Sequence, residues 1–346
     1  MKILGLTPNN PMTGETPEQM YLRKLKDLGH EIIITEQLDN LENLDIDVIV
    51  SLSEATCEHA AKVAKVLNKP FYAHMEWLPR WRIGRDEPCE WGYENMPFIE
   101  KMGWIRTYQR FVFFWGQANV KSLAGDCFKQ DMKDFVGADL IIETKILGVD
   151  EDRINEYKNG IRQDKHNEVT CIARFVPHKR LIDVIYALQF INFKGVLNLV
   201  GYGPEYGKYI QAAAMTGIEI AFWESEDKLV ALDRSKCCVS FWSGLVPMEA
   251  MMLGVPCVST PSDYMLELYG DTLLYGEQLS DIAEQIKICL EMEDIDRKLI
   301  CDYGINAMHQ KSISTYTQEE AVKQLESLIK LAIEKWKKTQ NQDSSE

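Results

Sequence analysis

The sequence predicts an α/β protein with two doubly wound parallel-sheet domains in tandem. Short apolar runs alternate with segments of helical spacing in both halves of the chain, and this alternation indicates parallel sheets covered by helices. A polar stretch over 160–167 separates the two series. The length of 346 residues suits two domains at roughly 150 residues each.

The first series begins at the N-terminus. Expected strands cover 2–6, 31–35, 48–50 and 70–73, and expected helices cover 18–28 and 54–67. Gly29 and His30 are expected to end the first of these helices. The regular alternation stops at residue 76 and resumes after 117.

The second series begins at Val169. Expected strands cover 169–173, 196–200, 219–222, 238–240 and 257–259, and expected helices cover 181–190, 205–215, 227–234 and 247–253. A long amphipathic helix is expected over 319–338. The predicted organisation is an N-terminal domain over 1–163 that also takes the C-terminal helix at about 312–338, a second domain over 168–311, and a polar, disordered tail over 339–346.

Composition excludes several classes of protein. The 38 Lys and Arg against 53 Asp and Glu give a net charge of -15, which disfavours general nucleic-acid binding. No apolar run approaches the roughly 20 residues of a membrane-spanning helix. The nine cysteines form no C-x-x-C pair and the six histidines are dispersed. We therefore expect reduced, buried cysteines, no metal site and a cytoplasmic protein.

Residues 76–116 interrupt the first series and hold five of the eight tryptophans, with arginines interleaved. One interpretation is an irregular, well-packed excursion that covers the sheet. The other is a surface for an acceptor or partner, because aromatic and Arg clusters are typical of binding surfaces. Peripheral membrane contact is a further alternative, since Trp and Arg suit an interface, although the net charge opposes anionic lipid.

Three loops that follow expected strands of the second series suit a phosphate pocket. Arg174 and Lys179 combine a bidentate fork with a point charge and can converge on one diphosphate. Gly201 and Gly203 let the backbone approach a ligand closely. Glu249 lies in the first turn of a helix, where it could accept hydrogen bonds from ligand hydroxyls. Taken singly, these features also suit solvated surface cations, a tight turn and a helix-stabilising glutamate.

The order of these loops resembles the retaining GT-B glycosyltransferases of the family-4 type, also called glycosyl transferases group 1. That family's pattern runs Arg-x4-Lys, Gly-x-Gly, and a Glu-x7-Glu element that leads into Glu-Ala-x-x-x-Gly-x-Pro. The chain matches this pattern at Arg174, Lys179, Gly201, Gly203, Glu249, Ala250, Gly254 and Pro256. The resemblance extends along nearly the whole chain, and residues 147–150 resemble the turn before the second domain.

The resemblance implies two Rossmann-like domains facing across a cleft, with the acceptor in the first and the donor in the second. It implies retaining transfer of a hexose from a nucleotide diphosphate sugar to an unknown acceptor, which is a sugar, a lipid-linked molecule or a protein, without a metal or other cofactor. The implied catalytic residues are His74, Arg174 and Lys179. The implied donor-nucleotide contacts are Arg174, Lys179, Gly201, Gly203, Gly244, Leu245, Val246 and Glu249. Acceptor-side candidates are Gly14, Trp81 and Arg82.

One position departs from the family pattern. The first Glu of Glu-x7-Glu falls at Phe241, and in the family that Glu normally contacts the donor sugar. Two alternatives therefore stay open: a nucleotide-sugar-binding protein with lost or altered transfer activity, and a sugar-nucleotide epimerase, which shares the fold. A transferase without that Glu is physically feasible, because the departing diphosphate can itself take the acceptor proton while Arg174 and Lys179 stabilise its charge.

Overall fold

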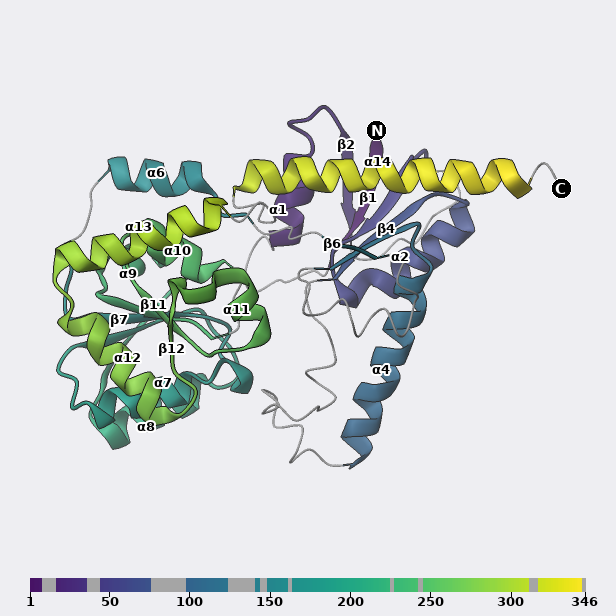
Figure 1. The fold of residues 1–346 in the computed structure, drawn as a ribbon. Coiled ribbons are helices and arrows are strands. Elements are labelled where there is room, and N and C mark those ends of the chain that lie inside the picture. The colour runs from purple at the N-terminus through teal and green to yellow at the C-terminus, as the bar shows by residue number, and fades with distance from the viewer. Residues whose placement is uncertain are drawn as a thin grey trace. The chain divides into compact units, whose positions relative to one another are not determined.

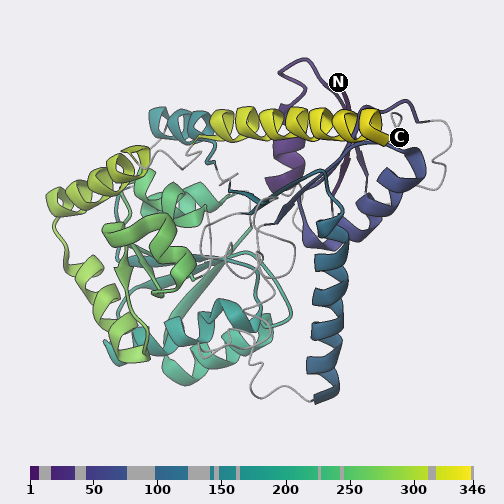
Figure 2. The same cartoon turned by 45° about the vertical axis from the view of Figure 1, so that its right-hand side comes forward.

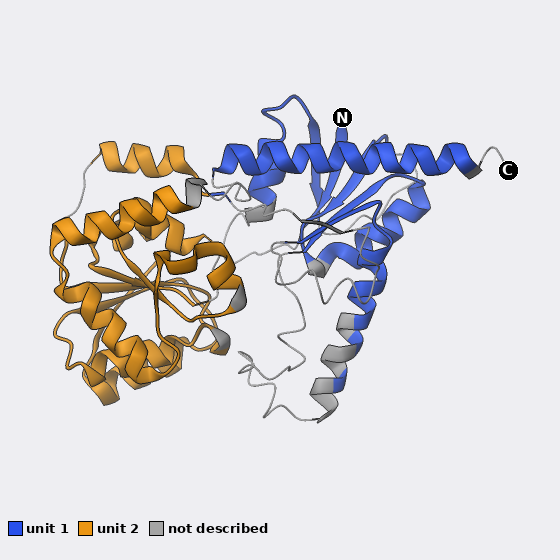
Figure 3. Ribbon diagram, viewed as in Figure 1, with its two compact units in different colours: residues 1–148, 317–346 blue, residues 149–316 orange. Residues whose placement is uncertain are grey.

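The protein divides into two compact units, residues 1–148 with 317–346 and residues 149–316 (Figure 3). The computed structural model describes residues 1–7, 17–35, 44–75, 98–123, 141–143, 148–160, 164–224, 227–241, 245–310 and 317–343. Each unit contains a six-stranded sheet whose paired strands are all parallel. The division falls between Gly148 and Val149, earlier in the chain than the expected boundary at 163–168.

The sheet of unit 1 has the strand order β2-β1-β3-β4-β5-β6. Its strands are β1 (Lys2–Leu6), β2 (Glu31–Thr35), β3 (Val48–Ser51), β4 (Phe71–Met75), β5 (Val120–Leu123) and β6 (Ile141–Glu143). The strands β1, β3, β4 and β5 are buried along nearly their whole length. Parallel strands that are covered by helices on both faces are buried in this way.

Within the described residues, the helices that accompany this sheet are α1 (Pro17–Lys24), α2 (Glu54–Leu67), α4 (Phe98–Gly116) and α14 (Gln318–Asp343). The core of the unit joins buried side chains of α1 and α14 to those of the strands, and α14 lies along the sheet in both views (Figure 1, Figure 2). The helix α2 packs on β1, β3 and β4, and α4 packs on α2. The expected tail begins later than residue 339, because α14 continues through Asp343.

Two predictions in this unit need correction. Residues 98–116 are not irregular but form α4, in which Phe111, Val112 and Trp115 are buried at helical spacing. The helix expected over 18–28 ends at Lys24 and is followed by hydrogen-bonded turns up to Gly29, whose φ is +83°. The remaining part of the tryptophan-rich stretch, 76–97, lies outside the described residues.

The sheet of unit 2 has the strand order β12-β11-β10-β7-β8-β9. Its strands are β7 (Glu168–Ile172), β8 (Val196–Val200), β9 (Glu219–Trp223), β10 (Cys237–Val239), β11 (Cys257–Ser259) and β12 (Leu274–Tyr275). All strands expected in the second series form, and none of their ends is displaced by more than one residue. Both units are therefore doubly wound α/β sheets.

The helices of unit 2 are α6 (Glu151–Asn159), α7 (Leu181–Phe190), α8 (Tyr206–Thr216), α9 (Lys228–Arg234), α10 (Val246–Met252), α11 (Asp263–Tyr269), α12 (Leu279–Glu291) and α13 (Asp294–Gln310). Buried side chains of α7, α8 and α12 form one continuous core with the strands. The helices α9 and α10 pack on each other, and α10 packs on α13.

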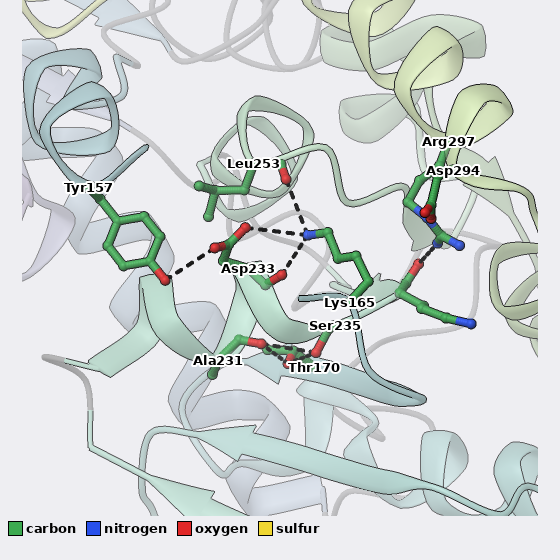
Figure 4. Close-up of polar contacts among 10 residues, drawn as sticks. Tyr157, Lys165, Thr170, Ala231, Asp233, Ser235, Leu253, Asp294 and Arg297 are labelled. Atoms are coloured by element: carbon green, nitrogen blue, oxygen red, sulfur yellow. Dashed lines mark hydrogen bonds and ion pairs between the residues drawn. The ribbon is translucent and has the colours of Figure 1, made fainter. Parts of the chain in front are cut away.

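The buried carboxylate of Asp233 links α6 and Lys165, at the start of unit 2, to α9 of the same unit (Figure 4). Asp233 of α9 is fully buried and lies 3.5 Å from Nζ of Lys165. The Lys165 amine also donates to the backbone oxygens of Asp233, at 2.6 Å, and Leu253, at 3.2 Å. From α6, Tyr157 donates its hydroxyl to Oδ2 of Asp233 at 3.3 Å. These bonds explain why residues before the expected boundary group with unit 2.

All cysteines within the described residues are free and buried, namely Cys57, Cys171, Cys237, Cys238, Cys257, Cys289 and Cys301. Burial raises the pKa of the thiols of Cys171, Cys237 and Cys257. A raised pKa keeps a thiol protonated and unreactive.

Candidate functional site

The strand order of unit 2 reverses between β7 and β10. The chain leaves β7 through α7 toward β8 on one side, and leaves β10 through α10 toward β11 on the other. In open parallel sheets, ligands bind at such a reversal, outside the carboxyl ends of the strands. The three loops singled out in the sequence all begin at this edge of the sheet.

The segment between β7 and α7 carries Arg174 and Lys179. Lys179 ends a short 3-10 turn and is only 8% exposed. Its Nζ donates to the backbone oxygen of Phe241 at 3.2 Å, so it joins the carboxyl ends of the two strands at the reversal. Arg174 is exposed, and its side chain makes no hydrogen bond or ion pair to another described residue. The segment therefore holds one cation inward and leaves the other accessible.

The glycine loop after β8 lies against this segment. Gly201 has a φ of +127°, and a Cβ there would lie 2.2 Å from the backbone oxygen of Ala173. A Cβ at Gly203 would lie 2.5 Å from the backbone oxygen of Phe175. In turn, the backbone N–H of Phe175 donates to the oxygen of Tyr202 at 2.7 Å. Both glycines are thus required for two backbones to approach each other, which supports the position of the cation-bearing segment.

Glu249 lies in the first turn of α10, and its side chain is 9% exposed. Its Oε1 lies 2.6 Å from Nζ of Lys228, the first residue of α9. Its Oε2 is buried and has no hydrogen-bond partner within the described part of the chain. The carboxylate is therefore held at one oxygen by a cation. No sequence pattern indicated Lys228, because the pair joins residues from different helices.

Three predicted contacts fall at the start of the same helix. Leu245 is the residue before the first turn, and Val246 begins it. The backbone oxygen of Leu245 accepts from the N–H of Glu249 at 3.1 Å. Gly244, the third of these predicted contacts, lies outside the described residues.

The side chain and the backbone of Phe241 face different surroundings. The ring is buried in the core of unit 2, and the guanidinium carbon of Arg180 lies 5.4 Å from its centroid. Arg180 has the left-handed φ of +49°, which is rare for a residue with a side chain. Its Nε donates to Asp183 at 2.7 Å. Sequence reasoning missed Arg180, because no local signal marks a left-handed arginine.

His74 lies within β4 of unit 1 rather than after the strand, since β4 extends through Met75. Its Nδ1 is 2.8 Å from Oγ of Ser122, which is also 2.6 Å from the hydroxyl of Tyr72. Burial lowers the pKa of His74 to about 3, so the imidazole is neutral near pH 7. Its Nε2 is buried and lacks a partner among the described residues. A role for His74 at the donor sugar stays a prediction.

The acceptor-side candidates Gly14, Trp81 and Arg82 lie outside the described residues. Within the described ranges, no helix has the length and apolar character needed to cross a membrane. In that same part of the chain, no three His, Cys, Asp or Glu side chains are grouped so as to hold a metal ion.

No protein-family model matches the sequence, and no curated protein sequence matches it. Solved structures do match this chain. The complex of HepE from Anabaena with UDP is similar over 94% of this chain and 99% of HepE, with a TM-score of 0.67 and 14% identity. The chain has a GT-B fold.

Two further solved structures have the same architecture. A glycosyltransferase from Rickettsia africae matches 95% of this chain and 98% of its own, with a TM-score of 0.62 and 13% identity. The α,α-trehalose 6-phosphate synthase from Burkholderia multivorans matches 91% of this chain and 77% of its own, with a TM-score of 0.64 and 12% identity. HepE is also known in complex with UDP-glucose. The predicted fold class of two Rossmann-like sheets is therefore confirmed.

Proposed function

We propose that the protein is a retaining, metal-independent glycosyltransferase that moves a hexose from a nucleotide diphosphate sugar to an acceptor. The observation that carries this proposal is the hydrogen bond from Lys179 to the backbone oxygen of Phe241 at the strand reversal. Glu249 lies in the first turn of α10, the helix that follows Phe241 in the chain. A cation at this edge suits a diphosphate, and a buried carboxylate with a remaining acceptor suits sugar hydroxyls. The solved complexes of HepE with UDP and UDP-glucose support this choice of donor.

The charges at the site suit the departure of a diphosphate. As the bond between the anomeric carbon and the phosphate oxygen breaks, negative charge develops on the leaving diphosphate. Arg174 and Lys179 would stabilise it at a site prepared in advance, which is the strongest general source of rate enhancement. The acceptor oxygen bonds to the anomeric carbon on the same face, and its proton passes to the leaving diphosphate. No protein nucleophile is needed.

His74 would contact the donor sugar as a neutral group. Its pKa of about 3 leaves the ring uncharged at physiological pH, and Nδ1 is already engaged by Ser122. The remaining nitrogen, Nε2, would then form one hydrogen bond to a sugar hydroxyl. A neutral partner suits a neutral hexose better than it suits a phosphate.

On the acceptor side we assign Gly14, Trp81 and Arg82. Tryptophan can stack on a sugar ring, and arginine can hold an acidic or phosphorylated group. Substituting Trp81 and Arg82 should raise the acceptor KM while donor binding stays unchanged. Normal transfer with loss of sedimentation on lipid vesicles would instead assign residues 76–116 to a peripheral membrane contact of a cytoplasmic enzyme. If neither property changes, the stretch contributes packing alone.

Phe241 favours a second candidate, a nucleotide-sugar-binding protein without transfer activity. The residue places a buried ring where the resembled family has a sugar-contacting carboxylate. Binding of the diphosphate would be unaffected, because Lys179 donates to the backbone oxygen of Phe241, which any residue at that position supplies.

One incubation separates these functions. The purified protein is mixed with UDP-glucose and a panel of sugar, lipid-linked and peptide acceptors, and the products are analysed for free UDP and for the configuration of the sugar. Release of UDP with an α-linked product supports the transferase. Binding without turnover supports the binding protein, and an epimerised donor supports an epimerase. A thermal-shift screen with uridine, guanosine and adenosine diphosphates identifies the base, since a ligand that binds the folded state raises its apparent stability.

A further inference from the structure

Lys228 and Glu249 form a pair that joins two helices on one side of the sheet of unit 2. Lys228 begins α9 and Glu249 lies in the first turn of α10, and these helices pack on each other. The Lys228 side chain is 26% exposed, whereas that of Glu249 is 9% exposed. The lysine therefore reaches from the surface to a carboxylate that is shielded from water.

The two oxygens of the Glu249 carboxylate are unequal. Oε1 accepts from Nζ of Lys228 at 2.6 Å, while Oε2 is buried and has no partner within the described residues. Buried polar atoms are nearly always hydrogen-bonded, and each exception calls for an explanation such as an absent ligand. The unpaired oxygen points to a hydrogen-bond donor that arrives from outside the protein.

A buried carboxylate needs a compensating charge to stay ionised. An ionised carboxylate only accepts hydrogen bonds, whereas a protonated one also donates. By occupying Oε1, the lysine fixes the rotation of the carboxyl group and leaves Oε2 free to accept a hydrogen bond. A hydroxyl group is the donor that this arrangement fits.

We propose that Lys228 is a positioning residue that sets Glu249 to accept a ribose hydroxyl of the donor nucleotide. This proposal rests on the proposed function, since it takes the ligand to be a nucleoside diphosphate. Lys228 makes no contact with the ligand itself. Its effect on binding passes through the orientation of the Glu249 carboxyl group.

The test compares ribonucleotides with deoxyribonucleotides. Calorimetry is used to measure binding of uridine diphosphate and its 2′-deoxy and 3′-deoxy forms, or the corresponding guanosine or adenosine compounds if the thermal-shift screen selects another base. Lys228→Met should weaken binding of the ribonucleotide about ten-fold or more. Binding of the deoxy form that lacks the contacted hydroxyl should hardly change, so the preference for ribose disappears. Lys228→Arg should restore that preference.

A matched control is available on another helix. Lys208 of α8 pairs with Glu205, whose side chain is also 9% exposed. Lys208 is 66% exposed and lies three residues from its partner, so the two pairs match in the burial of the glutamate and not in that of the lysine. Lys208→Met should leave both affinities unchanged.

Three results would overturn the proposal. Lys228→Met could keep the wild-type preference for ribose, or it could weaken both nucleotides equally, as general damage to the fold would. In either case the proposed function stands and only the role of Lys228 fails. If the wild-type protein binds no nucleoside diphosphate at all, the proposed function fails, and the role of Lys228 that rests on it fails as well.

Discussion

Lys179 offers the sharpest test of the proposed diphosphate site, because the residue is buried and its amine is hydrogen-bonded to the backbone at the strand reversal. Lys179→Met removes the charge and keeps the length of the side chain. Loss of its hydrogen bond to Phe241, 3.2 Å in length, should lower the free energy of unfolding by about 0.5–1.5 kcal/mol. Loss of a charge-assisted bond to a diphosphate should cost about 1.5–3 kcal/mol of binding, which is roughly a ten- to 150-fold weaker Kd.

Calorimetric titration with uridine diphosphate and with uridine separates the two effects. The diphosphate should bind more weakly to the variant, while the nucleoside binds as before. Lys121 of unit 1 provides the control, because it is also buried and its Nζ donates to the backbone oxygen of Ala118 at 2.6 Å. Lys121→Met should leave both affinities unchanged. The reasoning fails if Lys179→Met weakens both ligands equally, or if Lys121→Met weakens the diphosphate as much.

Two further predictions concern stability. Because burial lowers the pKa of His74 from 6.5 to about 3, the unfolded chain binds more protons than the folded one between these values. Stability conferred by His74 is therefore complete above pH 6.5 and is lost as the pH falls toward 3, by up to about 1.4 kcal/mol per pH unit. Urea unfolding of wild type and His74→Asn across this range should show the difference, and parallel pH profiles would contradict it. Gly201→Ala should lower stability by more than about 2 kcal/mol, since the new Cβ would meet the oxygen of Ala173 at 2.2 Å. Gly207→Ala, whose Cβ meets no atom within 4 Å, should be neutral or stabilising by up to about 1 kcal/mol, and equal losses at both glycines would refute the steric argument.

Most of the strands could be predicted because parallel sheets bury both faces of each strand, whereas β5, β6 and β12 were not predicted. The runs at 196–200 and 257–259 coincide with β8 and β11 at both ends, since each is a short apolar stretch bounded by turn residues. The helix α4 was missed although Phe111, Val112 and Trp115 recur at helical spacing. The interpretation as a binding surface rested on the tryptophan and arginine content of this stretch. Composition carries no information about periodicity, so it could not indicate the helix.

The site residues stay a prediction, and the sequence could not show their contacts, because motifs report spacing along the chain and not contacts across it. Arg174 and Lys179 fall in one segment, as their spacing indicated, but only the structure shows that one is exposed and the other held by a backbone oxygen. The pairing of Lys228 with Glu249 spans two helices, and the left-handed backbone of Arg180 depends on its surroundings. Such features arise from tertiary packing and leave no local pattern.

Phe241 shows why a departure from a sequence pattern can leave a site partly intact. A comparison of side chains records the loss of a carboxylate at this position. The interaction that links the position to Lys179 uses the backbone oxygen, which any residue supplies as long as β10 keeps its register beside β7. The ring meanwhile packs into the core and helps to hold that register. Under the proposed function, contacts to the diphosphate and contacts to the sugar would therefore be physically separable, because the first would depend on a cation and the backbone and the second on the side chain. Nucleotide affinity and sugar turnover should therefore be measured independently, since one can persist where the other is lost.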